Sequence, residues 1–420
     1  MATETARTVL MVAFHFPPAR GLSGIQRTLK AVRYLPDYQW QPVVLSAHPR
    51  AYGCTGTEQM GEIPASVSVS RAFALDSARH LSFKGRYLRL TALPDRWASW
   101  WLGAVPTGLA LIRRHRPKVI WSSYPIATSH LIALTLHRLT GIPWVADCRD
   151  AMCIDTFPDD PLTRKAFVRL ERAMVHRCAR LTVTTPGMLN LYRERYPELP
   201  RDRFSLLYNG YDEEDFENLP TASPRAPRSP LVLLHSGQLY PGLNDRDPCT
   251  FIEVLHRLHV RGVIGPASLE VIFRATGEGG YVQDLIRRYE VSSFVRVEPP
   301  LPYRQALQEM MQVDALLLLQ GSHFGHLIPA KLFEYLRVGK PLLPFVPPQS
   351  DSAALLRQMD FETPTDMHDA PGMENALLTF LEQVKNGTAR HGEASTWQRF
   401  SRRQQVAELA ALFNAVTNGP

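Results

Sequence analysis

Short runs of apolar residues alternate along most of the chain with stretches in which apolar residues recur at helical spacing. The first run spans Thr8 to Phe16, ends at two prolines and precedes a glycine-containing loop, after which Ile25 to Leu35 has helical spacing. Short strands that alternate with amphipathic helices are typical of a parallel sheet with helices on its faces. The pattern therefore predicts an α/β, doubly wound layer at the start of the chain.

The alternation has one interruption, which predicts two domains. Residues 218–230 are rich in Pro, Ser, Ala and Arg and lack periodicity, as expected of a linker. The alternation resumes over residues 231–393, and a last helix is expected over residues 394–416. A length of 420 residues suits two hydrophobic cores. We expect two Rossmann-like domains, residues 1–217 and 231–393, that face a cleft, since such sheets bind ligands beyond the carboxyl ends of their strands.

Composition narrows the class of partner. Hydrophobic residues make up 45% and charged residues 21% of the chain, which is typical of globular proteins and excludes disordered and collagen-like classes. The formal charge of +7 favours anionic partners such as nucleotide diphosphates, lipid phosphates or a membrane surface, but an ordinary solvated surface explains it equally well. From the sequence we expect no basic run to be interleaved with exposed aromatic residues, and therefore no nucleic-acid partner.

The cysteines and the short apolar runs bear on the compartment. The chain has 5 cysteines and no Cys-x-x-Cys pair, which argues against a disulfide framework and for a reducing compartment. No stretch fits a signal peptide or an uncharged transmembrane span. We therefore expect a cytoplasmic protein and leave open a peripheral contact with the inner face of the membrane. Trp97, Trp100 and Trp101, near Arg86, Arg89 and Arg96, fit such an interfacial contact or, more commonly, core packing.

Polar residues follow two of the predicted strands in the first domain. The loop from His15 to Gly24 has glycines that let backbone amides approach an anion, although an ordinary strand-to-helix turn is the slightly commoner explanation. The loop matches neither the dinucleotide-binding glycine pattern nor a Walker A loop. Asp147 and Asp150 end a later strand, where either carboxylate could orient an acceptor hydroxyl or a transferred sugar, or form a structural ion pair.

In the second domain, a lysine and a glutamate share one side of a predicted helix. Lys331 and Glu334 are three positions apart among apolar neighbours, where charges need partners. A cation at this place, like Arg246 in an earlier loop, can neutralise a leaving diphosphate, and a carboxylate can accept both hydroxyls of a ribose. A surface ion pair is the simpler alternative. His323 and His326 lack a third ligand in register, so no metal site is expected.

Six segments of the chain form a recognisable series. They are Phe16 to Arg27, Ser122 to Pro125, Gly141 to Asp150, Asn209 to Phe216, His235 to Tyr240, and Lys331 to Pro341. Together they resemble the retaining GT-B glycosyltransferases of the family 4 group, most of all the bacterial branch that builds surface polysaccharides. Each segment alone is a weak signal, but the resemblance covers nearly the whole chain in order.

The resemblance implies an enzyme that moves a sugar, with retention of configuration, from a nucleotide-sugar donor to a glycan, lipid-linked or small-molecule acceptor. It implies no metal or other cofactor, and a last helix that crosses back onto the N-terminal domain. Glu334 would bind the donor ribose, Arg246 and Lys331 would neutralise the diphosphate, and Asp150 would face the reacting centre. The further donor contacts that the resemblance implies are Gly24, Gly237, Gly277 and His326.

One position departs from the family pattern. The family has two acidic residues eight positions apart, and here His326 stands at the first of them, with Glu334 at the second. The first acid contacts the transferred sugar, whose hydroxyls a histidine can also hydrogen-bond. The departure keeps open an inactive GT-B subunit of a glycosylation complex, against which Lys331 and Glu334 argue. A GT-B nucleotide-sugar epimerase is a further alternative and would need an acid/base set in the cleft.

Overall fold

The computed structural model divides the chain into two compact units. It describes residues 6–22, 24–219, 230–239, 247–277, 279–322, 325–361 and 364–418. One unit combines Met1–Asn209 with Arg402–Pro420, and the other is Gly210–Ser401. The first boundary therefore falls earlier than residue 217, where the sequence pattern put it, and most of the expected linker lies outside the described residues.

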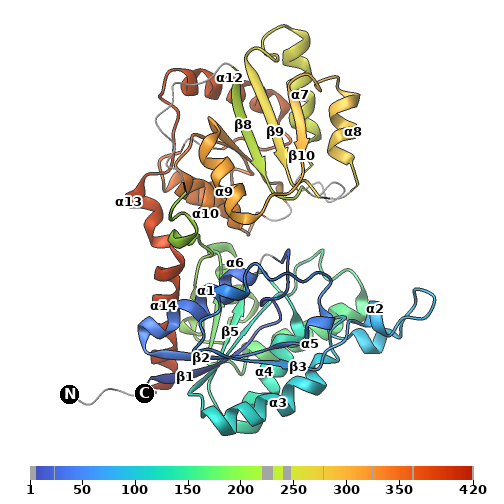
Figure 1. Ribbon diagram of the computed structural model, residues 1–420, viewed down its shortest axis with the longest axis vertical. Coiled ribbons are helices and arrows are strands. Elements are labelled where there is room, and N and C mark those ends of the chain that lie inside the picture. The colour runs from blue at the N-terminus through green and yellow to red at the C-terminus, as the bar shows by residue number, and fades with distance from the viewer. Residues whose placement is uncertain are drawn as a thin grey trace. The chain divides into compact units, whose positions relative to one another are not determined.

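The first unit is built on a seven-stranded sheet in the order β3-β2-β1-β4-β5-β6-β7 (Figure 1). The neighbouring strands pair in parallel. Since chain order reverses between β1 and β4, their carboxyl ends flank the switch point at which open α/β sheets bind ligands. The strands are β1 Arg7–Val12, β2 Trp40–Ala47, β3 Ser68–Ala72, β4 Val119–Ser123, β5 Trp144–Cys148, β6 Arg180–Val183 and β7 Phe204–Leu206.

Amphipathic helices cover this sheet. The apolar side chains of α1 join those of β1, β2 and β4 in one core cluster, while α3 and α4 pack against each other. Burial of both faces accounts for the strands of the sheet centre, β4 and β5, which are buried throughout. The helices are α1 Ile25–Tyr34, α2 Ser77–His80, α3 Trp100–His115, α4 Ala127–Thr140, α5 Pro161–Val175 and α6 Pro186–Arg195.

The last helix, α14 (Arg402–Thr417), belongs to the first unit, as the fold class predicts. Its buried side chains join the core that α1 and β1 form. The ring of Phe413 lies 5.3 Å from that of Trp40, whose indole N–H donates to Asn414 at 3.0 Å. The helix expected over 394–416 is not continuous, because a 3-10 turn at Gln398–Phe400 follows α13 (Ala394–Trp397), which lies in the second unit.

The second unit has a five-stranded parallel sheet in the order β10-β9-β8-β11-β12 (Figure 1). Chain order reverses between β8 and β11, which places the switch point at their carboxyl ends. The strands are β8 Leu231–Ser236, β9 Leu269–Arg274, β10 Val295–Glu298, β11 Ala315–Leu319 and β12 Leu342–Phe345.

The helices of the second unit bury their apolar faces on this sheet. Side chains from α7, α8 and α12 form one core cluster with those of the five strands. The helices around this sheet are α7 Cys249–Val260, α8 Tyr281–Arg288, α9 Tyr303–Gln312, α10 Ala330–Val338, α11 Asp351–Arg357 and α12 Ala370–Lys385. Among the helices described in either unit, none combines the length and the apolar character needed to cross a membrane.

Candidate functional site

The carboxyl edge of the second sheet brings together the candidate residues of that unit. Because parallel strands end at the same edge, the segments after β8, β9 and β11 meet there. Gly237 follows β8, Gly277 follows β9, and α10 begins at Ala330 after β11. The amide of Leu239 donates to the carbonyl of Thr276 at 3.3 Å, so the segments after β8 and β9 run side by side.

Lys331 lies in the first turn of α10 and reaches back to the end of β8. Its Nζ lies 3.2 Å from Nε2 of His235, and a Cβ on Gly237 would lie 2.8 Å from that Nζ. Gly237 has a φ of 112°, so both the backbone and the lysine require glycine there. A cation in a first turn opposes the helix dipole, and this turn has no acidic residue and no side-chain cap. The ammonium and the dipole therefore both favour a bound anion.

Two tyrosine hydroxyls hold Glu334 and the backbone at the end of β8. The Tyr303 hydroxyl, at the start of α9, donates to Oε1 of Glu334 at 2.8 Å. Tyr335 fixes the end of β8, since its hydroxyl accepts from the Ser236 amide at 2.9 Å and lies 3.3 Å from the Ser236 carbonyl. Burial raises the pKa of Tyr335, so its hydroxyl stays protonated. The glutamate and the backbone beside the lysine are thus both held in place.

His326 lies in the loop between β11 and α10, and a small polar network holds this loop. The Gln320 side chain donates to the Leu327 carbonyl at 2.9 Å, and the Ser352 hydroxyl donates to Gln320 at 2.6 Å. His326 therefore shares one loop and helix with the lysine and the glutamate, and its role stays a prediction. Arg246, expected at the diphosphate, lies outside the described residues.

In the first unit, Asp147 is one half of a buried ion pair. Arg27, on α1, donates to its two carboxylate oxygens at 2.9 and 2.7 Å, and the Thr182 and Ser123 hydroxyls donate at 2.7 and 3.0 Å. Burial alone would raise the pKa of Asp147, but Arg27 and the hydroxyls outweigh burial and hold it below its usual value. Of the roles open to Asp147, the contacts support the structural one.

Asp150, three residues on, lies in a different setting and stays half-exposed. Its carboxylate lies 3.8 Å from the guanidinium of Arg149, a side chain only 8% exposed, whose Nε donates to the Tyr124 carbonyl at 2.9 Å. A Cβ on Gly24 would lie 2.5 Å from Nδ1 of His15 and 3.0 Å from Cζ of Arg149. The glycine at the start of α1 therefore lets a buried cation approach the end of β1.

His15 is neutral at physiological pH because burial, helped by Arg149, lowers its pKa to about 3. The carboxyl edge of the first sheet thus combines a neutral imidazole, a buried guanidinium and a half-exposed carboxylate. These are groups that hydrogen-bond hydroxyls and anionic substituents.

Trp100 is buried in the core, and Trp97 and Trp101 are half-buried beside it. Trp100 is fully buried, with its ring 5.7 Å from that of Phe14. The Trp97 indole donates to the Ala51 carbonyl at 3.1 Å, and the Trp101 indole donates to the Thr135 hydroxyl at 2.9 Å. Of the two interpretations of this cluster, these contacts favour core packing.

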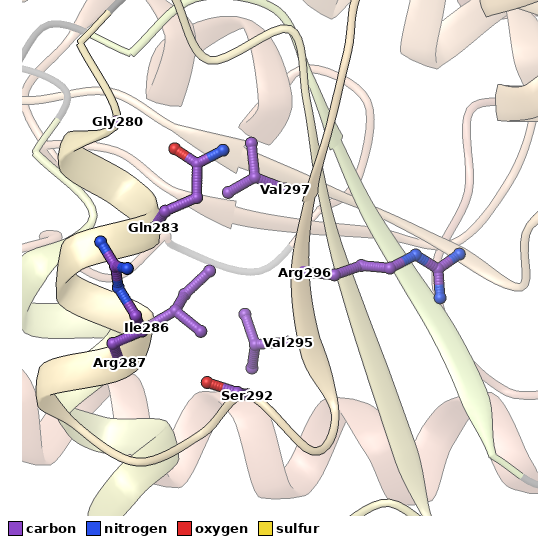
Figure 2. Close-up of a pocket in the computed structure, with 8 residues that line it drawn as sticks. All are labelled: Gly280, Gln283, Ile286, Arg287, Ser292, Val295, Arg296 and Val297. Atoms are coloured by element: carbon purple, nitrogen blue, oxygen red, sulfur yellow. The ribbon is translucent and has the colours of Figure 1, made fainter.

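A surface hollow of about 440 Å³ lies between α8 and β10, and none of the candidate residues lines it. Figure 2 shows Gln283 and Ile286 of α8 on the side of β10 that faces the helix, together with Val295, whereas Arg296 extends from the other side of the strand. Because β10 is the edge strand beyond β9, the hollow is separate from the carboxyl ends of β8 and β11. We assign it no part in the chemistry.

Sequence reasoning missed several supporting residues, namely His235, Tyr303, Tyr335, His15 and Arg149. The partners of His235 and Tyr303 lie 96 and 31 positions away along the chain, so no local spacing signals them. Arg149 had a signal, since it lies between Asp147 of β5 and Asp150, two residues beyond the end of that strand. Within the described ranges, no group of His, Cys, Asp and Glu side chains is arranged to hold a metal ion.

The comparisons with known proteins concern the fold and the class of protein. Residues 23–210 match the family model described as a glycosyl transferase 4-like domain. No curated protein sequence matches the chain. Among solved structures, sucrose-phosphate synthase from Thermosynechococcus elongatus is 12% identical with a TM-score of 0.64, over 97% of this chain and 98% of that one.

Two further structures are similar. Anabaena HepE, solved in complex with UDP and glucose, is 14% identical with a TM-score of 0.63, over 97% of this chain and 99% of that one. UDP-GlcNAc 2-epimerase from Neisseria meningitidis is 12% identical with a TM-score of 0.56, over 96% of this chain and 99% of that one. At these identities the likeness shows the fold, two Rossmann-like units of GT-B type.

The fold and the family match together define the class of protein: the chain is a GT-B glycosyltransferase. More narrowly, residues 23–210 form a glycosyl transferase 4-like domain, which lies in the first unit apart from its last residue.

Proposed function

We propose that this glycosyltransferase takes a sugar from a nucleotide-sugar donor and transfers it with retention of configuration, without a resident metal ion. The observation that carries the proposal is the pair on α10. Lys331 lies in an uncapped first turn against Gly237, and Glu334 is oriented by Tyr303. The helix start is suited to bind an anion, and the glutamate one turn further along is suited to bind a diol. These two ligand groups correspond to the diphosphate and the ribose of a nucleotide.

In this proposal each side chain has one task. Glu334 accepts hydrogen bonds from the ribose hydroxyls, and Lys331 neutralises the negative charge that grows on the diphosphate as the glycosidic bond breaks. In the retaining mechanism, the leaving phosphate takes the proton of the acceptor hydroxyl on the same face of the sugar. Such a mechanism requires no strong protein base, which agrees with Glu334 acting as a binding group.

The acceptor is proposed to meet the carboxyl edge of the first sheet. The half-exposed carboxylate of Asp150 beside Arg149 is suited to orient a hydroxyl-bearing glycan, lipid-linked sugar or small molecule. For the donor, a UDP-sugar is the first to test, because HepE was solved with UDP and glucose and the Neisseria epimerase with UDP-GlcNAc.

The test is titration calorimetry of the purified protein with UDP-, GDP-, dTDP- and ADP-sugars in a buffer that contains a chelator. One nucleotide family should bind. Glu334→Ala should weaken that binding by about 2 kcal/mol, roughly thirtyfold, because it removes charge-assisted hydrogen bonds to the ribose. Glu382→Ala, an exposed glutamate on α12, is the matched control and should leave the affinity unchanged.

Two outcomes would contradict the proposal in different ways. An unchanged affinity of Glu334→Ala would remove this glutamate from the donor site. Failure of every nucleotide-sugar to bind would favour the inactive-subunit alternative, which rests on His326 in place of an acid. In that case the substitution His326→Glu should restore donor binding.

A further inference from the structure

The segment between α2 and α3 combines cations with exposed apolar side chains. No acidic residue occurs from Ser77 to Pro94, whereas the same stretch carries four cations, Arg79, Lys84, Arg86 and Arg89. In Figure 1 it forms the light-blue loop that extends beyond α2.

The apolar side chains of this segment are unusually exposed. Phe83, Leu88 and Leu90 are exposed to 78%, 77% and 78%, and Leu81 and Tyr87 to 42% and 38%. Single exposed apolar residues are normal, but five within ten consecutive positions form a patch of the kind that marks an interaction site.

An ordered turn presents these side chains. Phe83 and Arg86 form an antiparallel bridge in which each amide donates to the other carbonyl, at 2.7 and 3.1 Å. The two residues between them, Lys84 and Gly85, have φ values of 50° and 76°, as a two-residue hairpin turn requires. We call the residues from Leu81 to Leu90 the basic hairpin. Its tip carries a phenylalanine followed by two cations, and Lys84 lies 5.8 Å from the centre of the Phe83 ring.

The ends of the basic hairpin are fixed to the first unit. Ser77 donates through its amide to the Arg96 carbonyl at 2.8 Å and through its hydroxyl to the Thr91 carbonyl at 2.7 Å. Arg89 forms an ion pair with Asp160, at the start of α5. Asp160 thus partly neutralises the charge of Arg89, whereas in the described part of the chain Arg86 has no side-chain partner.

We propose that the basic hairpin docks the protein onto the surface of an anionic lipid bilayer. Phe83, Leu88 and Leu90 enter the boundary between headgroups and hydrocarbon, while Lys84 and Arg86 pair with lipid phosphates. A membrane fits better than a protein partner because cations interleaved with exposed apolar side chains, without any acid, complement a negative headgroup layer above an apolar one. The proposal concerns a surface of the first unit and does not depend on the donor.

The first experiment measures co-sedimentation of the full chain with vesicles of phosphatidylcholine, alone or mixed with phosphatidylglycerol. The wild type should bind the mixed vesicles, and added salt should weaken the binding. A cation near an anionic surface contributes about fivefold to the partition constant, so Lys84→Gln with Arg86→Gln should lower it about twenty-five-fold. Arg113→Gln with Arg114→Gln, on the exposed side of α3, removes the same charge and should have an effect of about twofold or less.

The apolar contribution is tested separately. Leu88→Ser with Leu90→Ser should weaken binding to the mixed vesicles, whereas Val260→Ser with Val263→Ser, exposed in the second unit, should not. In Phe83→Trp, the emission of the new indole should shift to shorter wavelength on vesicle binding, as an inserted ring requires. Thermal unfolding checks that these surface variants are folded.

Three results would overturn the proposal. The first is failure of the wild type to bind anionic vesicles. The second is an equal loss of affinity in the α3 variant and the hairpin variant, which would mean that net charge, and not the basic hairpin, causes the binding. The third result is self-association of the wild type in solution through Leu88 and Leu90 without vesicle binding, which would mean that the basic hairpin binds a second copy of the chain.

Discussion

The ion pair between Arg27 and Asp147 gives the sharpest stability prediction. The arginine is 6% exposed and the aspartate fully buried, and the arginine also donates to the carbonyls of Leu207 and Tyr208 at 3.1 and 2.9 Å. Removing one partner of a buried pair costs about 3–5 kcal/mol, because the other charge is left without compensation. The Ser123 and Thr182 hydroxyls still contact the carboxylate in Arg27→Met. We therefore expect a loss near the lower end, about 3 kcal/mol.

The assay is urea unfolding followed by tryptophan fluorescence, since the fully buried Trp40, Trp100, Trp121 and Trp144 all lie in the first unit. Arg114→Met, on the exposed side of α3, is the control and should change the stability by about 0.5 kcal/mol or less. The double variant Arg27→Met with Asp147→Leu should be less destabilised than the sum of the single variants, because it leaves no unpaired charge. A loss below about 1 kcal/mol for Arg27→Met, or simple additivity, would refute the structural role of the pair.

Two further predictions concern a buried histidine and the lysine of α10. Burial lowers the pKa of His130 to about 4, so the folded state resists a proton that the unfolded chain takes up near pH 6.5. The neutral histidine therefore costs no stability above pH 6.5, but the free energy of unfolding falls as the pH drops toward 4, by about 2 kcal/mol at pH 5. In urea unfolding, His130→Gln should show a flatter dependence of stability on pH over this range than the wild type. An equally steep dependence in both proteins would contradict this role of His130. Lys331→Ala should lower the turnover of a nucleotide-sugar more than its calorimetric affinity, because leaving-group charge grows in the transition state; equal losses would indicate uniform binding instead.

Much of the fold could be predicted from the chain because its signals are local. Strand and helix alternation depends on the spacing of apolar residues, and both parallel sheets follow from it. The last helix was predicted as one element, but its periodicity gave no sign of the 3-10 turn at Gln398–Phe400. Tertiary contacts, such as that of Ser401 with Tyr211, accompany this interruption, and local spacing does not reveal them.

The candidate site was predictable only in part because its geometry depends on contacts between distant segments. Lys331 and Glu334 could be named from one helix, whereas Tyr303 and His235 could not. Local spacing could not distinguish the role of Asp147 from that of Asp150, since the difference lies in Arg27, which is 120 positions from Asp147.

The tryptophan cluster shows a different limit of the sequence. Aromatic residues near arginines indicate either a core or a surface, and only packing decides between them. Here Trp100 is in the core and its two neighbours are half-buried, whereas five exposed apolar residues lie earlier in the chain, in the basic hairpin.

The most direct test of sugar transfer from a nucleotide donor is proton NMR of the wild-type protein with the donor that it binds, in the presence of a chelator. The spectra follow both the release of the nucleoside diphosphate and the configuration of the anomeric carbon in the product. We predict that the donor is consumed without added metal and that an α-configured donor gives an α-configured product. A donor that binds but stays intact in the presence of a range of acceptors, or a product of inverted configuration, would contradict the account.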